Sequence, residues 1–325
     1  MDSGTHPGPP LNLGSRLPPR VEVYEVGPRD GLQNELRSVP LKDKLRLVTA
    51  LVASGERRIE LTSFVSPKWV PQLADADELL ARVERPPGVT FSALVPNLKG
   101  LERAKTARLE EAAVFASATE THSRKNINKS IAEALHVAGA VTKGALAAGM
   151  RVRGYLSVVW GCPYEGTTAL ATVVDLARRL LDFGIYQLSL GDTIGVGIPT
   201  QTESILEALL RHVPASKLAL HLHDTRGTAL ANALVGMTYG VTTLDASVGG
   251  LGGCPYAPGA AGNLATEDLV NLLHGMGVQT GIDLSRLVEA GEVAQELIGR
   301  KLAGKYLQAA LGERDRVIAR KRLAH

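Results

Sequence analysis

The feature that most constrains the fold of this chain is an alternation of short apolar or β-branched runs with longer amphipathic stretches, repeated eight times. This alternation is typical of consecutive βα units, whose strands form a parallel sheet. The expected strands are Val21–Val26, Arg58–Leu61, Thr90–Val95, Glu111–Ala116, Arg151–Val159, Tyr186–Leu190, Leu218–Leu222 and Thr243–Val248. The expected helices follow them near residues 41–54, 73–83, 97–108, 127–148, 168–182, 200–212, 226–239 and 265–276.

Eight βα units favour a closed (β/α)₈ TIM barrel, an α/β fold, over an open doubly wound sheet, which usually has about five or six strands. We therefore expect a flexible N-terminal arm over residues 1–20 and the barrel over residues 21–282. Additional C-terminal helices are expected over residues 283–311, packed outside the barrel, followed by an exposed charged tail over residues 312–325.

Composition excludes several classes of protein. A chain with 45% hydrophobic and 21% charged residues is globular and not disordered. The formal net charge is only +3, and a basic excess lies in the charged tail, so we expect no nucleic-acid partner. Long apolar runs are lacking, so we expect no membrane partner. Residues 1–20 lack the apolar core of a secretion signal, and the two cysteines suit a reducing compartment, so a cytoplasmic location is expected.

Polar residues gather where several of the expected strands end. Active sites of closed βα barrels lie at the C-terminal ends of their strands, so these residues are candidates for function. They are Gly27–Gly31 after the first strand, Glu60 in the second, Gly191–Thr193 after the sixth, His221–Asp224 at the seventh, and Gly249–Asn263 after the eighth.

Two histidines at the seventh strand indicate a metal site. His221 and His223 are two positions apart, so their imidazoles point to the same side of a strand. Asp30 can add a carboxylate from the neighbouring first strand end, and Asn263 can add an amide. The alternative is a pair of ordinary core or surface histidines. Imidazole and oxygen ligands without thiolate suit Mg²⁺ or Mn²⁺ better than structural zinc.

Three charged residues beside this site are candidates for catalysis. Arg29 either forms a plain salt bridge with Glu60 or Asp192, or stabilises an oxyanion with its permanent charge, and the two roles are compatible. Glu60 and Asp192 are either structural partners or groups that handle and orient protons.

The glycine-rich segment 248–263 is expected to be a mobile loop, with neither helix nor strand. It has neither the glycine pattern of a Rossmann helix nor the lysine of a P-loop. Cys254 lies within it and is a candidate proton donor or nucleophile. Cys162, in a similar glycine- and proline-rich run, is more typical of a small buried residue.

Four motifs of this chain resemble those of 3-hydroxy-3-methylglutaryl-CoA lyases. They are GPRDGLQNE at 27–35, TSFVSPKWVPQ at 62–72, SLGDTIGVG at 189–197 and GLGGCPYA at 250–257. The likeness covers roughly residues 21–310. It implies a metal-dependent barrel lyase that cleaves 3-hydroxy-3-methylglutaryl-CoA to acetyl-CoA and acetoacetate, as in leucine degradation or ketone-body formation.

The resemblance also implies roles for individual residues. It implies metal ligation by Asp30, His221, His223 and Asn263. It implies substrate contact by Arg29 and Gln33, and catalytic roles for Arg29, Cys254, Glu60, Asp192 and His221, the last as a candidate proton shuttle. An acyl-CoA substrate, an Mg²⁺ or Mn²⁺ cofactor and a homodimer are expected with it.

Other activities stay open at this stage. A lyase for a longer branched 3-hydroxy-3-alkylglutaryl-CoA would have the same reaction centre. Condensing synthases of the isopropylmalate or homocitrate type usually carry Gly-Glu-Arg where this chain has Gly252–Pro255. Arg226 stands where animal lyases are expected to have tyrosine, which leaves the contacts to the acyl chain and CoA open. A non-catalytic metal-binding scaffold is disfavoured, because each candidate position holds a competent residue.

Overall fold

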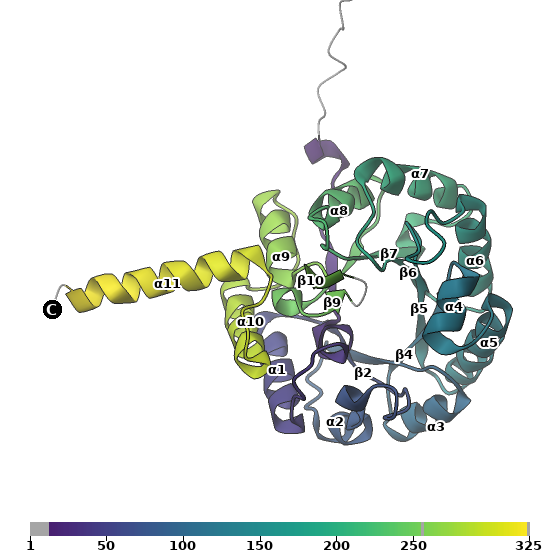
Figure 1. Ribbon diagram of the computed structural model, residues 1–325, viewed down its shortest axis with the longest axis horizontal. Coiled ribbons are helices and arrows are strands. Elements are labelled where there is room, and N and C mark those ends of the chain that lie inside the picture. The colour runs from purple at the N-terminus through teal and green to yellow at the C-terminus, as the bar shows by residue number, and fades with distance from the viewer. Residues whose placement is uncertain (1–12, 255–256, 324–325) are drawn as a thin grey trace, which may run out of the picture.

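The computed structural model describes residues 13–254 and 257–323, and it is a closed parallel barrel surrounded by helices (Figure 1). Neighbouring strands pair in chain order, and β1 pairs with β8 to close the barrel. The strands are β1 Glu22–Glu25, β2 Arg58–Ser63, β3 Thr90–Leu94, β4 Glu111–Ser117, β5 Arg151–Ser157, β6 Gln187–Asp192, β7 Leu218–Leu222 and β8 Thr243–Ala246. The expected (β/α)₈ fold is confirmed.

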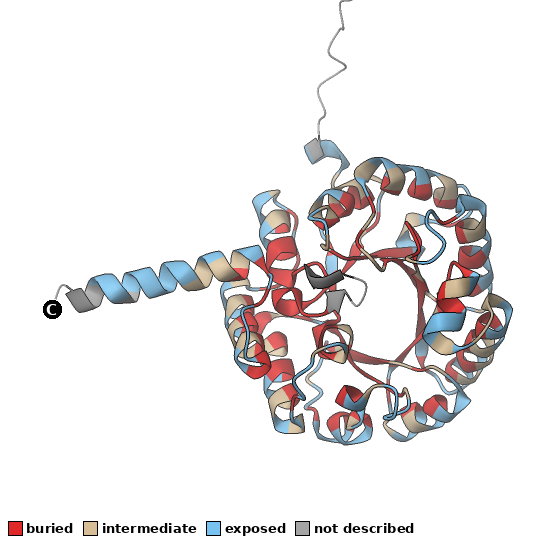
Figure 2. Ribbon diagram, in the orientation of Figure 1, coloured by how far each residue is buried: buried red, intermediate tan, exposed pale blue. Residues whose placement is uncertain are grey.

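Helices follow the strands, and most of them cover the outside of the barrel. They are α1 Leu41–Ser54, α2 Ala76–Arg82, α3 Leu98–Thr106, α4 Glu120–Ile127, α5 Ile131–Ala147, α6 Leu170–Asp182, α7 Pro199–Leu210, α8 Ala229–Thr238, α9 Thr266–Gly275, α10 Leu284–Ile298 and α11 Lys305–Leu323. Their buried residues face the strands, and their exposed residues face outward (Figure 2). Among the described residues, no helix is long and apolar enough to cross a membrane.

The helix expected near residues 127–148 is confirmed as α5, but a separate helix, α4, which the sequence analysis did not predict, precedes it. Asn128 ends α4 in the left-handed conformation, with φ of 54°, a conformation that asparagine tolerates better than most residues. Ser130 then caps α5 by accepting from the Glu133 backbone N–H, while the Glu133 side chain accepts from the Ser130 N–H. This capping box was readable in the sequence as Ser-x-x-Glu.

The two ends of the chain extend beyond the βα units. Of the expected N-terminal arm, residues 1–12 lie outside the described part, Leu13–Arg16 form a 3-10 turn, and Arg20 pairs with Gln279. At the other end α10 packs against α1, and α11 runs on to Leu323 through the expected charged tail. The second half of α11 projects from the body and is exposed where it is described (Figures 1 and 2).

Charged and polar side chains fill part of the barrel interior. Glu111 on β4 is fully buried and accepts hydrogen bonds from the Tyr24 hydroxyl at 2.6 Å and from Arg58 Nη2 at 2.5 Å. Tyr24 lies on β1, which does not neighbour β4, so this contact crosses the inside of the barrel. The Tyr186 hydroxyl also donates to Glu111. Paired charges therefore occupy positions that apolar residues fill in many barrels.

Three carboxyl groups lie buried together around β1 and α9. Burial raises the pKa of Glu25 to about 7 and that of Glu267 to about 8. Burial, together with the charges of Glu25 and Glu267, also raises the pKa of Glu56 well above its usual value. Glu56 Oε1 is a buried atom that has no hydrogen-bond partner among the described residues. Between about pH 5 and 8 these three carboxyl groups therefore hold more protons in the folded chain than in the unfolded chain.

This difference predicts that the free energy of unfolding falls as pH rises through that window, because raised carboxyl pKa values stabilise the folded state only while the groups stay protonated. Glu56→Gln should remove one titrating group, so the free energy of unfolding should fall less steeply between about pH 5.5 and 8.5. Urea unfolding at a series of pH values measures this pH dependence of the free energy of unfolding. The exposed Glu110→Gln is the control, and identical slopes for wild type and Glu56→Gln would contradict the prediction.

Candidate active site

A short helical turn after β1 carries the first functional residues. Gly27–Gly31 form one turn of π-helix with Pro28 as its second residue, where the missing N–H costs nothing because the first turn of a helix has no acceptor for it. Arg29 is buried and donates from Nε to Glu60 Oε2 and from Nη1 to Asp30 Oδ1, both at 2.5 Å. Burial opposes its charge, but the carboxylates of Glu60 and Asp30 outweigh burial and raise the pKa of Arg29. Its guanidinium is therefore permanently charged.

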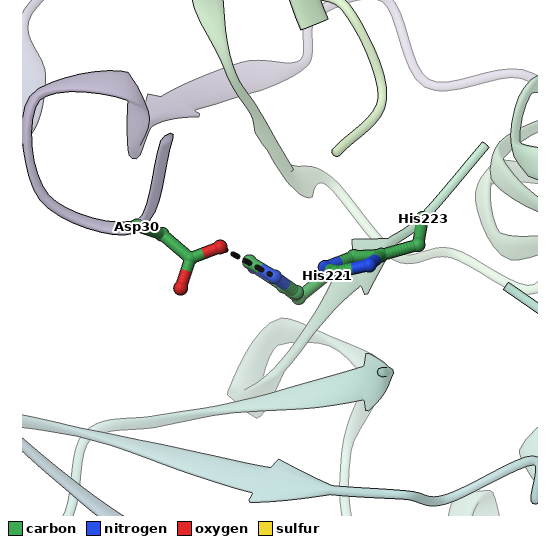
Figure 3. Close-up of side chains that lie close together, drawn as sticks. All are labelled: Asp30, His221 and His223. Carbon is green, nitrogen blue, oxygen red and sulfur yellow. Dashed lines mark ion pairs between the residues drawn. The ribbon is translucent and has the colours of Figure 1, made fainter. Parts of the chain in front are cut away.

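Asp30, His221 and His223 converge at the mouth of the barrel (Figure 3). Each offers one ligand atom, and these atoms all lie within 4.8 Å of one another. His221 Nε2 is 3.7 Å from Asp30 Oδ2, and the two imidazole centroids are 5.4 Å apart. Both imidazoles reach the same cluster from the end of β7, as the spacing of two residues predicts.

The protonation states of Asp30 and His223 suit a metal ion. Burial alone would raise the pKa of Asp30, but Arg29 and the two imidazoles lower it well below its usual value. Burial lowers the pKa of His223 to about 4, so its ring is neutral at pH 7. His223 Nδ1 is also a buried atom without a hydrogen-bond partner in the described structure. A carboxylate, a neutral imidazole and an unpaired ring nitrogen fit a divalent cation.

Asn263, the fourth expected ligand, lies beside Asp30. Its Nδ2 donates to Asp30 Oδ2 at 2.9 Å and to the Leu251 carbonyl at 3.0 Å. Its backbone pairs with that of His223, which brings it to the end of β7. It would supply its amide oxygen as a ligand.

Asp245 and Arg153 are residues of the site that the sequence analysis missed. Asp245 Oδ2 is 3.2 Å from His221 Nδ1, so the carboxylate holds the ring with its Nε2 toward Asp30. Arg153 donates to both oxygens of Asp245, from Nη2 to Oδ1 at 2.6 Å and from Nη1 to Oδ2 at 3.1 Å. Both side chains are fully buried. Burial lowers the pKa of His221, but the Asp245 hydrogen bond and the Asp30 charge outweigh burial, so its pKa is raised. The available signal was a charged residue inside each of two expected strands.

Tyr155 on β5 was also missed. Its hydroxyl donates to Glu60 Oε2 at 3.2 Å, and its ring meets the His221 ring edge-on at 5.9 Å between centroids. Glu60 is fully buried, and its Oε1 has no hydrogen-bond partner among the described residues. Burial raises the pKa of Glu60, although Arg29 opposes the rise. Oε2 of this carboxyl group is fixed by two hydrogen bonds, and Oε1 is available to accept another.

Asp192 is not bonded to these residues by any contact found in the described structure. Its two oxygens accept from the backbone N–H groups of Val196 and Gly197, at 3.0 and 2.9 Å, and so shape the loop after β6. The salt bridge considered for Arg29 therefore forms with Glu60. Arg226, from the next loop, donates to the carbonyls of Ile194 and Gly195 in the same β6 loop.

The remaining candidates are Gln33, Cys254 and Cys162. Gln33 lies two residues after the π-helical turn and is half-buried. The backbone of Cys254 lies in β9, but its side chain lies outside the described residues. Cys162 is buried, and its Sγ accepts from the Thr119 hydroxyl at 3.1 Å.

The expectation of a loop without strands over residues 248–263 is wrong. Val248–Gly250 form a 3-10 turn, and β9 Gly253–Cys254 pairs antiparallel with β10 Ala257–Ala261. Gly249 has a φ of 64°, which glycine adopts without strain, and this permits the turn. The hairpin is held by hydrogen bonds between backbone groups, and a glycine-rich sequence does not by itself predict that pairing.

The fold and this cluster define a (β/α)₈ barrel protein with a candidate metal site at the C-terminal ends of its strands. The HMGL-like family matches residues 20–294. Hydroxymethylglutaryl-CoA lyase YngG of Bacillus subtilis is 50% identical over 291 residues, which cover 90% of this chain and 97% of that protein. The chain therefore belongs to the HMGL-like family, and the resemblance drawn from the four motifs is confirmed.

Solved structures agree with this assignment. The crystal structure of the Bacillus subtilis HMG-CoA lyase matches with a TM-score of 0.89 and 49% identity, covering 90% of this chain and 98% of that one. An HMG-CoA lyase from Acinetobacter baumannii, in complex with coenzyme A and 3-methylmalate, matches with a TM-score of 0.85 and 36% identity. That match covers 89% of this chain and 95% of the other.

The ligand cluster predicts a measurable metal affinity. Titration of the purified, chelator-treated protein with Mn²⁺, followed by electron paramagnetic resonance, should show one bound ion. His223→Ala should weaken binding at least about tenfold, because it removes one of the imidazole ligands. His212→Ala, which changes an exposed histidine after α7, is the control. Equal affinity in wild type and His223→Ala would refute the assignment of this site.

Proposed function

We propose that this chain is a hydroxymethylglutaryl-CoA lyase, which cleaves 3-hydroxy-3-methylglutaryl-CoA to acetyl-CoA and acetoacetate. The observation that carries the proposal is the convergence of Asp30, His221 and His223 beside the Arg29–Glu60 pair at the barrel mouth. Half of the aligned residues are shared with a hydroxymethylglutaryl-CoA lyase, and a relative of the same fold was solved with coenzyme A, which supports an acyl-CoA substrate.

The cleavage removes one proton from the substrate and adds one proton to a product. The tertiary hydroxyl at C3 loses its proton, the bond between C2 and C3 breaks, and C3 becomes the ketone of acetoacetate. The electron pair of that bond passes into the thioester as an enolate, which takes a proton at C2 to give acetyl-CoA. The site must therefore provide a proton acceptor, charge stabilisation and a proton donor.

We propose that Asp30, His221, His223 and Asn263 hold Mg²⁺ or Mn²⁺. The bound cation would supply Lewis acidity, which lowers the pKa of a coordinated hydroxyl and orients the substrate oxygens. Asp245 fixes the His221 ring through Nδ1, so that Nε2 is presented to the ligand cluster. The hydrogen bond of Asn263 to Asp30 holds the Asp30 carboxylate in place.

The Arg29–Glu60 pair supplies charge and a proton acceptor. The hydrogen bonds from Arg29 to Glu60 and Asp30 use Nε and Nη1, so Nη2 can donate to the thioester oxygen as enolate charge develops. Glu60 Oε2 is held by Arg29 and Tyr155, and its unpaired Oε1 is the atom that can accept the hydroxyl proton.

Three further candidates have proposed roles. We propose that Cys254, which follows Gly253 in the hairpin after β8, donates the proton to C2. Gln33, next to the Arg29 turn, would contact the substrate. Asp192 would act by shaping the β6 loop through its two backbone hydrogen bonds.

The proposed activity is tested by acetyl-CoA release from a panel of 3-hydroxy-3-alkylglutaryl-CoA esters with increasing alkyl length. We expect the methyl ester to give the highest kcat/KM, a chelator to abolish turnover, and Mg²⁺ or Mn²⁺ to restore it. A preference for a longer alkyl group would reassign the substrate. Full turnover in metal-free protein would overturn the mechanism.

Arg29→Gln is expected to lower kcat and kcat/KM together by about 100- to 1,000-fold, because it removes a charge that acts on the developing enolate. Arg29→Lys keeps the charge without the planar fork and should be intermediate. Steady-state kinetics at saturating metal measure both, with thermal unfolding to show that the variants are folded. A raised KM at constant kcat would instead make Arg29 a binding group.

A further inference from the structure

A single buried carboxylate connects the two loops that carry the candidate site. Glu25, the last residue of β1, is fully buried. Its Oε1 accepts the backbone N–H of Gly27 at 2.7 Å and the backbone N–H of Val248 at 3.0 Å. Its Oε2 accepts the Thr266 hydroxyl at 2.7 Å. The carboxylate thus has three donors from three separate segments.

The two N–H groups begin the two loops in question. Gly27 is the first residue of the turn that presents Arg29 and Asp30. Val248 is the first residue of the 3-10 turn that leads from β8 into the β9–β10 hairpin. One oxygen atom therefore fixes the start of the metal-ligand turn against the start of the hairpin segment. Thr266, at the first turn of α9, keeps the carboxylate from rotating away.

Two glycines of the π-helical turn lie so close to neighbouring atoms that a side chain on either would collide with them. A Cβ atom on Gly27 would lie 2.5 Å from Glu25 Oε1, so only glycine permits this hydrogen bond. A Cβ atom on Gly31 would lie 2.7 Å from Ser247 Oγ and 2.8 Å from Leu251 Cβ. The two loops are therefore in close contact at both ends of the π-helical turn.

We propose that Glu25 is a positioning residue that holds the Asp30 turn and the hairpin base in one register and so sets the metal affinity of the site. It does not touch the ligand cluster itself, and it acts through the backbone of Gly27 and Val248. The inference rests on the proposed function only for its effect on turnover. Its effects on metal binding and on the backbone stand apart from any substrate.

Glu267 provides a matched comparison within the same structure. It is also a buried glutamate, and both of its oxygens accept the backbone N–H of Gly249, at 3.0 and 2.8 Å. It holds the hairpin base but makes no hydrogen bond to the Asp30 turn in the described structure. Removal of each carboxylate should therefore affect different segments.

The experiment compares Glu25→Met, Glu25→Gln and Glu267→Met in chelator-treated protein. Mn²⁺ affinity is measured by electron paramagnetic resonance, and backbone protection by hydrogen exchange with mass spectrometry. Glu25→Met keeps the side-chain length but removes the acceptor, so the Kd for Mn²⁺ should rise at least about tenfold. Exchange should become faster both in peptides covering residues 27–31 and in those covering residues 248–252.

The two other variants distinguish loss of the hydrogen bonds that Glu25 makes to both loops from a general loss of order in the hairpin segment. Glu25→Gln keeps an oxygen that can accept both N–H groups, so its Kd should stay within about threefold of wild type. Glu267→Met should speed exchange only over residues 248–252 and leave the Kd unchanged. With substrate, Glu25→Met should lower kcat more than it raises KM.

Folding is followed by circular dichroism and thermal unfolding. If Glu25→Met does not fold, Thr266→Val replaces it, because loss of the hydroxyl frees Glu25 to rotate and should raise the Kd about threefold. An unchanged Kd in the folded Glu25→Met, or in Thr266→Val in its place, overturns the proposal. So does an equally weak Glu25→Gln, since the charge and not the bridge would then matter. Inactivity of wild type towards the proposed substrate, with these shifts intact, overturns only the proposed function.

Discussion

The arrangement of the site depends on the ion pair between Arg153 and Asp245, which lies across the inside of the barrel. Both side chains are fully buried, and β5 and β8 do not neighbour each other, so the pair joins two opposite parts of the barrel wall. A buried ion pair is stable only when its remaining hydrogen-bonding capacity is used. Asp245 meets this requirement, because it also accepts from Ser189 at 2.8 Å and lies 3.2 Å from His221 Nδ1. The imidazole orientation is thus set by the barrel core.

Buried carboxylates hold the loops around the mouth in a similar way. Asp192 accepts two backbone N–H groups of the β6 loop, and Asp224 accepts the Ala229 N–H at the start of α8. Asp268 accepts the N–H groups of Lys305 and Tyr306 and so fixes the start of α11. Loops rich in glycine have few side-chain contacts of their own, so hydrogen bonds from their backbone to fixed acceptors provide their order.

The barrel and the convergence of Asp30, His221 and His223 could be predicted from the sequence, because both follow from local patterns. Strand and helix periodicity gave eight βα units, and strand ends of a closed barrel necessarily meet, which brought Asp30 to His221 and His223. The Arg153–Asp245 pair could not be found this way, since a contact between two non-neighbouring strands depends on barrel geometry that no local pattern encodes. The hairpin after β8 was missed for a related reason, because its pairing relies on backbone groups and not on residue type.

The two oxygens of Asp30 have different neighbours. Oδ1 accepts from the Arg29 guanidinium at 2.5 Å. Oδ2 faces His221 Nε2 at 3.7 Å (Figure 3), and it also accepts from the Asn263 amide at 2.9 Å. A guanidinium and a metal ion can therefore share one carboxylate without competing for the same oxygen. Because Arg29 partly neutralises Asp30, this carboxylate would bind a cation less strongly than a lone carboxylate would. A substrate oxygen placed beside this carboxylate would lie close to two positive charges, and that proximity is what a developing enolate requires.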